Sequence, residues 1–130
     1  MNKGKVLIID DEEIVRISCR RILVPEGYDV ETVKSAVEGF ALLAGGRFDV
    51  VLTDLKMPDI DGIEVLRRVK KEWPEVEVIV ITGYQTINTA VQAIKLGAFD
   101  YLEKPFTPDG IVSAIERAME QRGTGEQASA

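Results

Sequence analysis

The chain has 130 residues, of which 45% are hydrophobic and 29% charged, and it carries a formal net charge of −6 and no histidine. This is the size and composition of one globular domain, and the negative charge disfavours binding to nucleic acid or to an anionic membrane, while histidine-based catalysis is excluded. Cys19 is the single cysteine, so no intrachain disulfide forms, and no apolar run nears the roughly 18 residues that span a bilayer, so we expect a cytoplasmic protein.

Short apolar runs alternate with helical patterns along the chain. Runs rich in β-branched residues predict strands, and apolar residues spaced three and four apart predict helices. In chain order, the predicted strands are residues 6–9, 28–33, 50–53, 76–81 and 99–102. The predicted helices carry apolar stripes that include Val15 and Ile22, Phe40 and Leu43, Leu66 and Val69, Ala90 and Ile94, and Ile111 and Ile115. This alternation predicts an α/β fold: a single doubly wound domain with a parallel five-stranded sheet and residues 28–33 at an edge.

The last eight residues are small and polar and offer nothing to bury. We therefore predict one domain over residues 1–122, followed by a polar tail or the start of a linker over residues 123–130. We also expect Cys19 to lie in the core and Asp61 to cap the helix that begins near Gly62.

Polar side chains follow four of the five predicted strands. Asp10 and Asp11 come after the first strand, Asp54 after the third, Thr82 after the fourth and Lys104 after the fifth. Because the carboxyl ends of parallel strands meet at one edge of the sheet, where ligands bind, we expect these side chains to converge. Three carboxylates in a small crevice repel one another unless a cation lies among them, and oxygen ligands suit magnesium. The sequence therefore predicts a Mg²⁺ site.

Asp54 is the best-placed nucleophile because it stands alone at the end of a central strand. A carboxylate beside Mg²⁺ can attack a phosphoryl donor and form an aspartyl phosphate, while the metal and a lysine neutralise the transferring group. Lys104 would pair with the phosphoryl oxygens, and the Thr82 hydroxyl would donate to one of them. Asp54, Thr82 and Lys104 are thus the predicted catalytic residues.

The motifs together resemble the receiver domain of bacterial two-component response regulators, over residues from about Lys5 to Arg122. The matching segments are 8–11, 52–58, 61–62, 81–83 and 97–106. The resemblance implies the strand order 2-1-3-4-5 and a cis Lys104-Pro105 bond. It also implies that Asp54 accepts phosphate from the phosphohistidine of a sensor histidine kinase or phosphotransfer protein.

The same resemblance implies the ligand set of the metal. Asp11, Asp54 and the carbonyl of Lys56 would bind Mg²⁺ directly, and Asp10 would act through water. Lys56 and Tyr84 occupy positions that, in such domains, tune hydrolysis of the phosphoryl group. We hypothesise that they hinder the attacking water and lengthen the phosphorylated lifetime.

The resemblance further implies a switch. Thr82 would move toward the phosphate and Tyr101 would turn inward behind it, changing the surface made by the helix near 87–94, the strand at 99–102 and the helix after Pro105. A dimer through this surface and control of an output domain or partner follow from the resemblance. Residues 82–106 look most like receivers of nitrogen-regulation-type transcriptional activators, but hybrid kinases and single-domain proteins stay open.

Other interpretations compete with this one. A Mg-dependent phosphatase also uses an aspartate nucleophile, but such enzymes usually carry a second acid two residues later, where Lys56 stands here. A flavin-binding module would need a hydroxyl-rich phosphate cradle in place of Asp10 and Asp11. A phosphorylation-independent scaffold requires an incompetent metal site. Taken singly, each site residue also has a plain structural interpretation, such as a helix cap or a solvated lysine, and the shared location favours a site.

Overall fold

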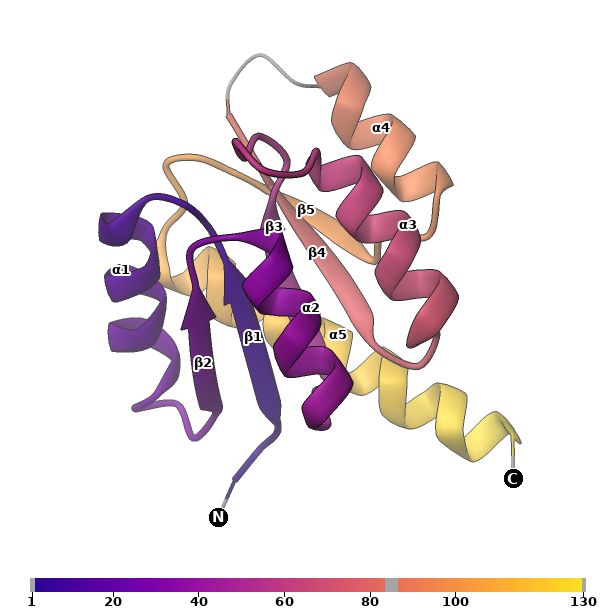
Figure 1. The fold of residues 1–130 in the computed structure, drawn as a ribbon. Helices are drawn as coiled ribbons and strands as arrows, with labels where there is room; N and C mark the ends of the chain where they lie inside the picture. Colours follow the sequence, from indigo (N-terminus) through magenta and orange to yellow (C-terminus); the bar gives the residue numbers. More distant parts are fainter. Residues whose placement is uncertain (1, 84–86, 130) are drawn as a thin grey trace.

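The computed structural model describes residues 2–83 and 87–129, apart from the side chains of Thr82, Ile87 and residues 123–129. Within these residues, five parallel strands form one sheet in the order β2-β1-β3-β4-β5 (Figure 1). The strands are β1 (Lys5–Ile9), β2 (Asp29–Val33), β3 (Val50–Asp54), β4 (Glu77–Thr82) and β5 (Asp100–Glu103). The doubly wound α/β fold and its strand order are as predicted, with β2 at an edge.

Helices cover both faces of the sheet. They are α1 (Glu13–Leu23), α2 (Ala36–Gly45), α3 (Gly62–Glu72), α4 (Ile87–Lys95) and α5 (Pro108–Ser129). The contacts place α1 and α5 on one face and α2, α3 and α4 on the other (Figure 1). Each parallel connection therefore crosses the sheet through a helix, as the alternating sequence pattern requires.

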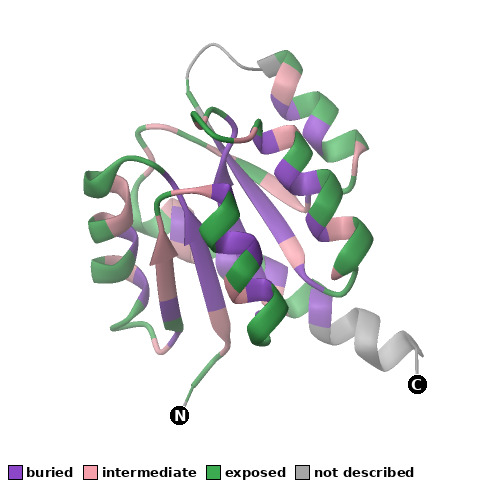
Figure 2. Ribbon diagram, in the orientation of Figure 1, coloured by how far each residue is buried: buried purple, intermediate pink, exposed green. Residues whose placement is uncertain are grey.

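Two apolar cores result, one on each face of the sheet. Val6 and Ile8 of β1 point toward α1 and α5, whereas Leu7 and Ile9 point toward α2 and α3. Because side chains alternate along a strand, a strand buried on both faces is apolar throughout. Figure 2 shows this burial along the central strands and the inner faces of the helices. Cys19, on the buried side of α1, lies in the core, as expected.

The loop between β3 and α3 is held tightly against the end of the sheet. The carboxylate of Asp61 accepts a hydrogen bond from the backbone N–H of Ile63 at 2.9 Å, so it caps α3 as predicted. At Gly62, a Cβ atom would lie 2.4 Å from Cα of Leu55 and 2.5 Å from the carbonyl oxygen of Asp54. Glycine thus lets α3 begin directly against the last residue of β3.

Helix α5 extends to Ser129, past the predicted domain end at Arg122. The Arg122 side chain is buried and lies 2.8 Å from Oδ1 of Asp49, so the packed part of the domain includes this residue. The assignment of residues 123–130 as a tail or linker stays a prediction. Across the described ranges, no helix is both long and apolar enough to cross a membrane.

Candidate functional site

The carboxyl ends of β1 and β3 and the loop after β5 bring Asp10, Asp54 and Lys104 together. Asp10 is fully buried and Asp54 is 6% exposed. The Lys104 Nζ atom lies 2.9 Å from Oδ2 of Asp54 and 3.3 Å from Oδ2 of Asp10. The Lys104-Pro105 peptide bond is cis, as the resemblance implied. The three residues that the sequence placed at separate strand ends therefore meet in one cluster.

Both carboxylate oxygens of Asp54 are oriented by hydrogen bonds. Oδ1 accepts from the backbone N–H of Lys56 at 2.9 Å, and Oδ2 accepts from the Lys104 ammonium. The backbone of the next residue, Leu55, donates to the carbonyl of Ile81 at 3.1 Å, which fixes the end of β3 against β4. The carboxylate is thus held in a fixed orientation at the end of β3.

Asp10 has one satisfied oxygen and one unsatisfied oxygen. Oδ1 accepts from the backbone N–H of Glu12 at 2.9 Å, whereas the buried Oδ2 has no hydrogen-bond partner among the described residues. Burial raises the pKa of the Asp10 carboxyl; the Glu12 hydrogen bond lowers it, the charge of Asp54 raises it and Lys104 lowers it. A buried carboxylate oxygen that accepts no hydrogen bond, with only the Lys104 ammonium 3.3 Å away, favours a further cation.

Glu12 is a site residue that the sequence analysis missed. Its Oε1 atom lies 2.7 Å from Nζ of Lys104, and carboxylate oxygens of Asp10, Glu12 and Asp54 all lie within 4.8 Å of one another. The sequence feature that could have indicated Glu12 is its position in the run of acidic residues that follows β1. The predicted strand ends drew attention to Asp10 and Asp11 instead.

Lys104 carries the positive charge of the pocket. Burial lowers the pKa of its ammonium, but the hydrogen bonds with Glu12 and Asp54 outweigh this effect and raise the pKa above its usual range. The ammonium therefore stays protonated, and it faces three carboxylates. This excess of acidic oxygens, together with the unpartnered oxygen of Asp10, fits a hard divalent cation such as Mg²⁺.

Asp11 and Lys56 lie beside this cluster. Asp11 is exposed and lines a cleft of about 500 Å³ together with residues 55–61 of the β3–α3 loop. The carboxylate of Asp11 is not part of the three-acid cluster of the described residues. Lys56 contributes its backbone N–H to Asp54, and its side chain is exposed. Their roles as metal ligands stay predictions.

The predicted switch residues lie on the two neighbouring strands β4 and β5. Thr82 is the last residue of β4 and pairs with Glu103 of β5, but its side chain lies outside the described part. Tyr101 is 48% exposed, so its ring lies outside the core. Tyr84, which the lifetime hypothesis invoked, lies outside the described residues.

Similarity to known proteins identifies the family. A family model described as the response regulator receiver domain matches residues 6–116. The chain belongs to the response regulator receiver domain family. This receiver domain is 41% identical over 117 residues to a putative NtrX-like response regulator of Rickettsia bellii, covering 88% of this chain and 24% of that protein. The domain thus spans about a quarter of the length of this curated relative.

Two solved structures resemble the receiver domain closely. NtrX from Brucella abortus in complex with ADP is 34% identical with a TM-score of 0.95, over 99% of this chain and 30% of that one. The beryllofluoride-activated NtrC4 receiver domain dimer, solved in solution, is 40% identical with a TM-score of 0.87, over 91% of this chain and 98% of that one.

Proposed function

We propose that this receiver domain is a phospho-accepting signalling switch in which Asp54 takes a phosphoryl group from a sensor histidine kinase or phosphotransfer protein. The observation that carries this proposal is the pairing of the Asp54 carboxylate with Lys104 at 2.9 Å beside a buried oxygen of Asp10 that accepts no hydrogen bond. The chain has no histidine, so the phosphohistidine donor belongs to another protein.

The reaction is a displacement at phosphorus. An oxygen of Asp54 forms a bond with the phosphorus atom, the N–P bond of the phosphohistidine breaks, and its electron pair returns to the imidazole. The Lys56 backbone N–H and the Lys104 ammonium orient the attacking carboxylate. Lys104 then neutralises charge on the phosphoryl oxygens, and the Thr82 hydroxyl donates to one of them.

Magnesium is the proposed cofactor. Asp11, Asp54 and the carbonyl of Lys56 would hold it directly, with Asp10 acting through water, and the buried unpartnered oxygen of Asp10 supports this arrangement. When bound, Mg²⁺ supplies positive charge that offsets the charge on the phosphoryl oxygens. The only chemistry of the domain would be its own phosphorylation and the slow loss of the phosphoryl group.

The proposed readout is a change of the surface formed by α4, β5 and α5. Val91, Ile94 and Tyr101 are large apolar side chains exposed there, at 41–49%. Phosphorylation would draw Thr82 toward the phosphate and Tyr101 inward, which alters this surface and its use in a dimer. The NtrC4 receiver domain neighbour forms a dimer when activated by beryllofluoride.

The Rickettsia bellii response regulator and Brucella abortus NtrX extend well beyond a receiver domain, which supports a C-terminal output domain or a separate output partner controlled by this domain. Kinases that phosphorylate such proteins act inside the cell, so we propose a cytoplasmic location. The observations on the described residues do not favour the phosphatase alternative, because Lys56 stands where its second acid would be.

The direct test is incubation with acetyl phosphate and Mg²⁺, followed by intact mass spectrometry. We expect one added phosphoryl group on the wild-type protein, none on Asp54→Asn, and the normal amount on the control Asp109→Asn, whose side chain is exposed on α5. Steady consumption of acetyl phosphate without a modified protein would support the phosphatase, and modification of Asp54→Asn would contradict the assignment of Asp54.

A further inference from the structure

The Lys104 ammonium is surrounded by carboxylates. A lysine ammonium carries three N–H donors. In the receiver domain it hydrogen-bonds Oε1 of Glu12 at 2.7 Å and Oδ2 of Asp54 at 2.9 Å, and it lies 3.3 Å from Oδ2 of Asp10. Three carboxylates therefore surround it, and the shortest of the three distances is the one to Glu12. A phosphoryl oxygen that approaches this ammonium therefore competes with these carboxylates for its donors.

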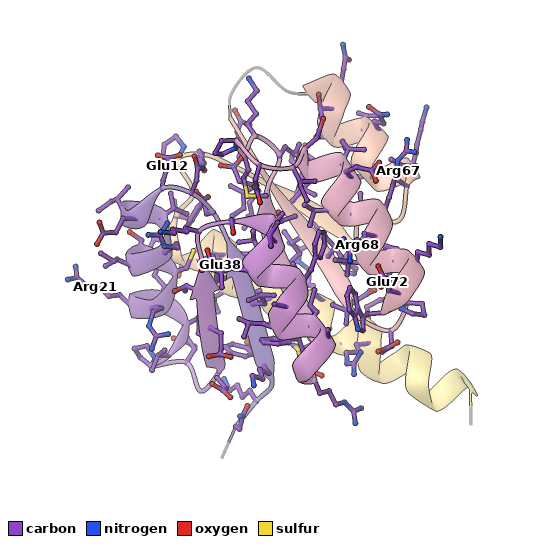
Figure 3. All side chains as sticks on the ribbon, viewed as in Figure 1. Glu12, Arg21, Glu38, Arg67, Arg68 and Glu72 are labelled. Carbon is purple, nitrogen blue, oxygen red and sulfur yellow. The ribbon has the colours of Figure 1, made fainter. Side chains whose placement is uncertain are left out.

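Glu12 occupies a helix position at which glutamate is not a favoured residue. It is the N-cap residue of α1, yet its side chain makes no capping hydrogen bond. Short side chains such as aspartate, asparagine and serine are favoured there, and glutamate is not among them. Its backbone N–H donates to Asp10, and its side chain extends to Lys104 instead of capping the helix. Figure 3 labels Glu12 at the start of α1, beside the end of the sheet to which β1 and β2 point.

Of the three carboxylates, Glu12 is the one that can leave at least cost. Its side chain is 54% exposed, whereas the side chains of Asp10 and Asp54 are 0% and 9% exposed. An exposed carboxylate that breaks an ion pair is rehydrated, so the net loss is small. A dianionic phosphoryl group on Asp54 would also repel the Glu12 charge.

We propose that Glu12 is a positioning residue that restrains the Lys104 ammonium in the unmodified receiver domain and yields it to a phosphoryl oxygen when Asp54 is modified. This inference rests on the proposed role of Asp54 as the phosphoryl acceptor. Glu12 then competes with the phosphoryl group for Lys104, so it opposes the modified state. Without this competition, a phosphoryl mimic binds more tightly.

The test is the affinity of the domain for beryllofluoride at saturating Mg²⁺, measured by ¹⁹F NMR titration. Glu12→Gln removes the charge and the hydrogen-bonding carboxylate, whereas Glu12→Asp keeps the charge but is too short to reach Lys104. We expect both variants to bind beryllofluoride about threefold more tightly than the wild type, the range of a partly exposed ion pair.

Glu13→Gln is the matched control. Glu13 is the next residue, it is exposed, and it makes no hydrogen bond or ion pair within the described ranges. It therefore reproduces the loss of one negative charge near the pocket without touching Lys104. We expect this variant to bind beryllofluoride as the wild type does.

A second readout follows Lys104 itself, without metal or beryllofluoride. Its ammonium protons, assigned by their absence in Lys104→Arg, should be visible by ¹H–¹⁵N NMR in the wild type and in Glu13→Gln because hydrogen bonding slows their exchange with water. They should broaden or shift in Glu12→Gln and Glu12→Asp. A change that appears in the affinity but not in this signal would contradict restraint of Lys104.

The outcomes separate this inference from the proposed function. Equal or weaker beryllofluoride binding by the Glu12 variants, in a wild-type domain that binds it, overturns the role of Glu12 alone. An equal gain in Glu13→Gln does the same, because it would show a general charge effect. Failure of the wild-type domain to bind beryllofluoride would overturn the proposed function and this inference together.

Discussion

The two ends of the sheet each bury a cation beside a carboxylate, but they balance its charge differently. At the amino end, Nε of Arg122 lies 2.8 Å from Oδ1 of Asp49, and its guanidinium also donates to the carbonyl oxygen of Glu75. The second oxygen of Asp49 accepts from the backbone N–H of Lys5 at 2.8 Å. Both oxygens of the Asp49 carboxylate thus have partners.

At the carboxyl end, one cation meets three carboxylates. Lys104 contacts Asp10, Glu12 and Asp54, and Oδ2 of Asp10 stays without a hydrogen-bond partner. Among the buried side chains that the structure describes, this is the one oxygen or nitrogen atom in that state. The ion pair of Arg122 with Asp49 connects separate parts of the fold and stabilises it. At the carboxyl end, the acidic oxygens outnumber the cations, so this cluster favours the binding of an additional cation.

The largest expected effect concerns the thiol beneath the carboxyl end. Burial, with a contribution from the Asp10 charge, raises the pKa of Cys19 from 9.0 to about 12. Because Cys19 is 0% exposed and the thiolate is the reactive form, alkylation by iodoacetamide at pH 9 should be at least about a hundredfold slower in the folded protein than in concentrated urea. A rate in the folded protein within about tenfold of the rate in urea would contradict the burial of this thiol.

The second largest expected effect is the loss of the ion pair between Arg122 and Asp49 at the amino end of the sheet. Arg122→Met leaves the carboxylate of Asp49 without its partner in a partly buried position, so we expect a loss of about 3 kcal/mol in the free energy of unfolding. Urea denaturation followed by circular dichroism measures it, and Mg²⁺ should not change the difference. Arg117→Met is the control, because Arg117 pairs with Asp100 on the surface at 3.0 Å. That variant should lose less than about 1 kcal/mol, and equal losses would contradict the special role of Arg122.

An aspartate-to-asparagine substitution should change the free energy of unfolding in opposite directions at the two ends of the sheet. Asp49→Asn weakens the pair with Arg122 and should lower the free energy of unfolding by about 2 kcal/mol. Asp10→Asn removes a buried charge whose Oδ2 has no hydrogen-bond partner, so without metal it should raise stability by about 1 kcal/mol. Thermal unfolding in EDTA measures both variants.

Addition of Mg²⁺ provides a control for the two variants Asp49→Asn and Asp10→Asn. A ligand that binds the folded state raises its stability, so Mg²⁺ should stabilise the wild type and Asp49→Asn. The stabilisation should shrink in Asp10→Asn, because the carboxylate that favours the cation is gone. A lower stability of Asp10→Asn than of the wild type in EDTA would contradict the claim that the acidic charge at the carboxyl end exceeds the positive charge of Lys104.

The smallest expected effect concerns an exposed ion pair on α3. Arg68 and Glu72 lie along α3, as Figure 3 shows, and their Nε and Oε2 atoms are 2.7 Å apart. Both side chains are about half exposed, at 50% and 44%. Glu72→Gln should therefore cost less than about 0.5 kcal/mol in urea denaturation. A loss comparable to that of Arg122→Met would mean that distance, and not burial, decides the strength of these pairs.

The sequence predicts much of the fold because each apolar run is short, β-branched and followed by a helical stripe. The convergence of Asp10, Asp54 and Lys104 follows from the same pattern, since parallel strands end at a common edge. The contact of Glu12 with Lys104 does not follow, because it depends on where α1 begins and how far a long side chain reaches. The pair of Arg122 with Asp49 joins residues distant in the chain, which no local pattern reveals.

The extent of α5 is not evident from the sequence, for a local reason. Residues 123–130 contain two glycines and several small polar residues, which disfavour a helix, yet α5 continues to Ser129. Propensity is a weak determinant when a helix is already formed, because each added residue extends an existing hydrogen-bonded ladder.

The most direct test of the central claim is a crystal structure of the domain grown with Mg²⁺ and beryllofluoride. We expect the ion beside Asp11, Asp54 and the Lys56 carbonyl, and the beryllofluoride on the Asp54 carboxylate within hydrogen-bond distance of the Lys104 ammonium. A pocket without either group, with the Asp10 and Asp54 carboxylates turned toward bulk solvent, would contradict the claim that this cluster of acids prepares Asp54 to accept a phosphoryl group.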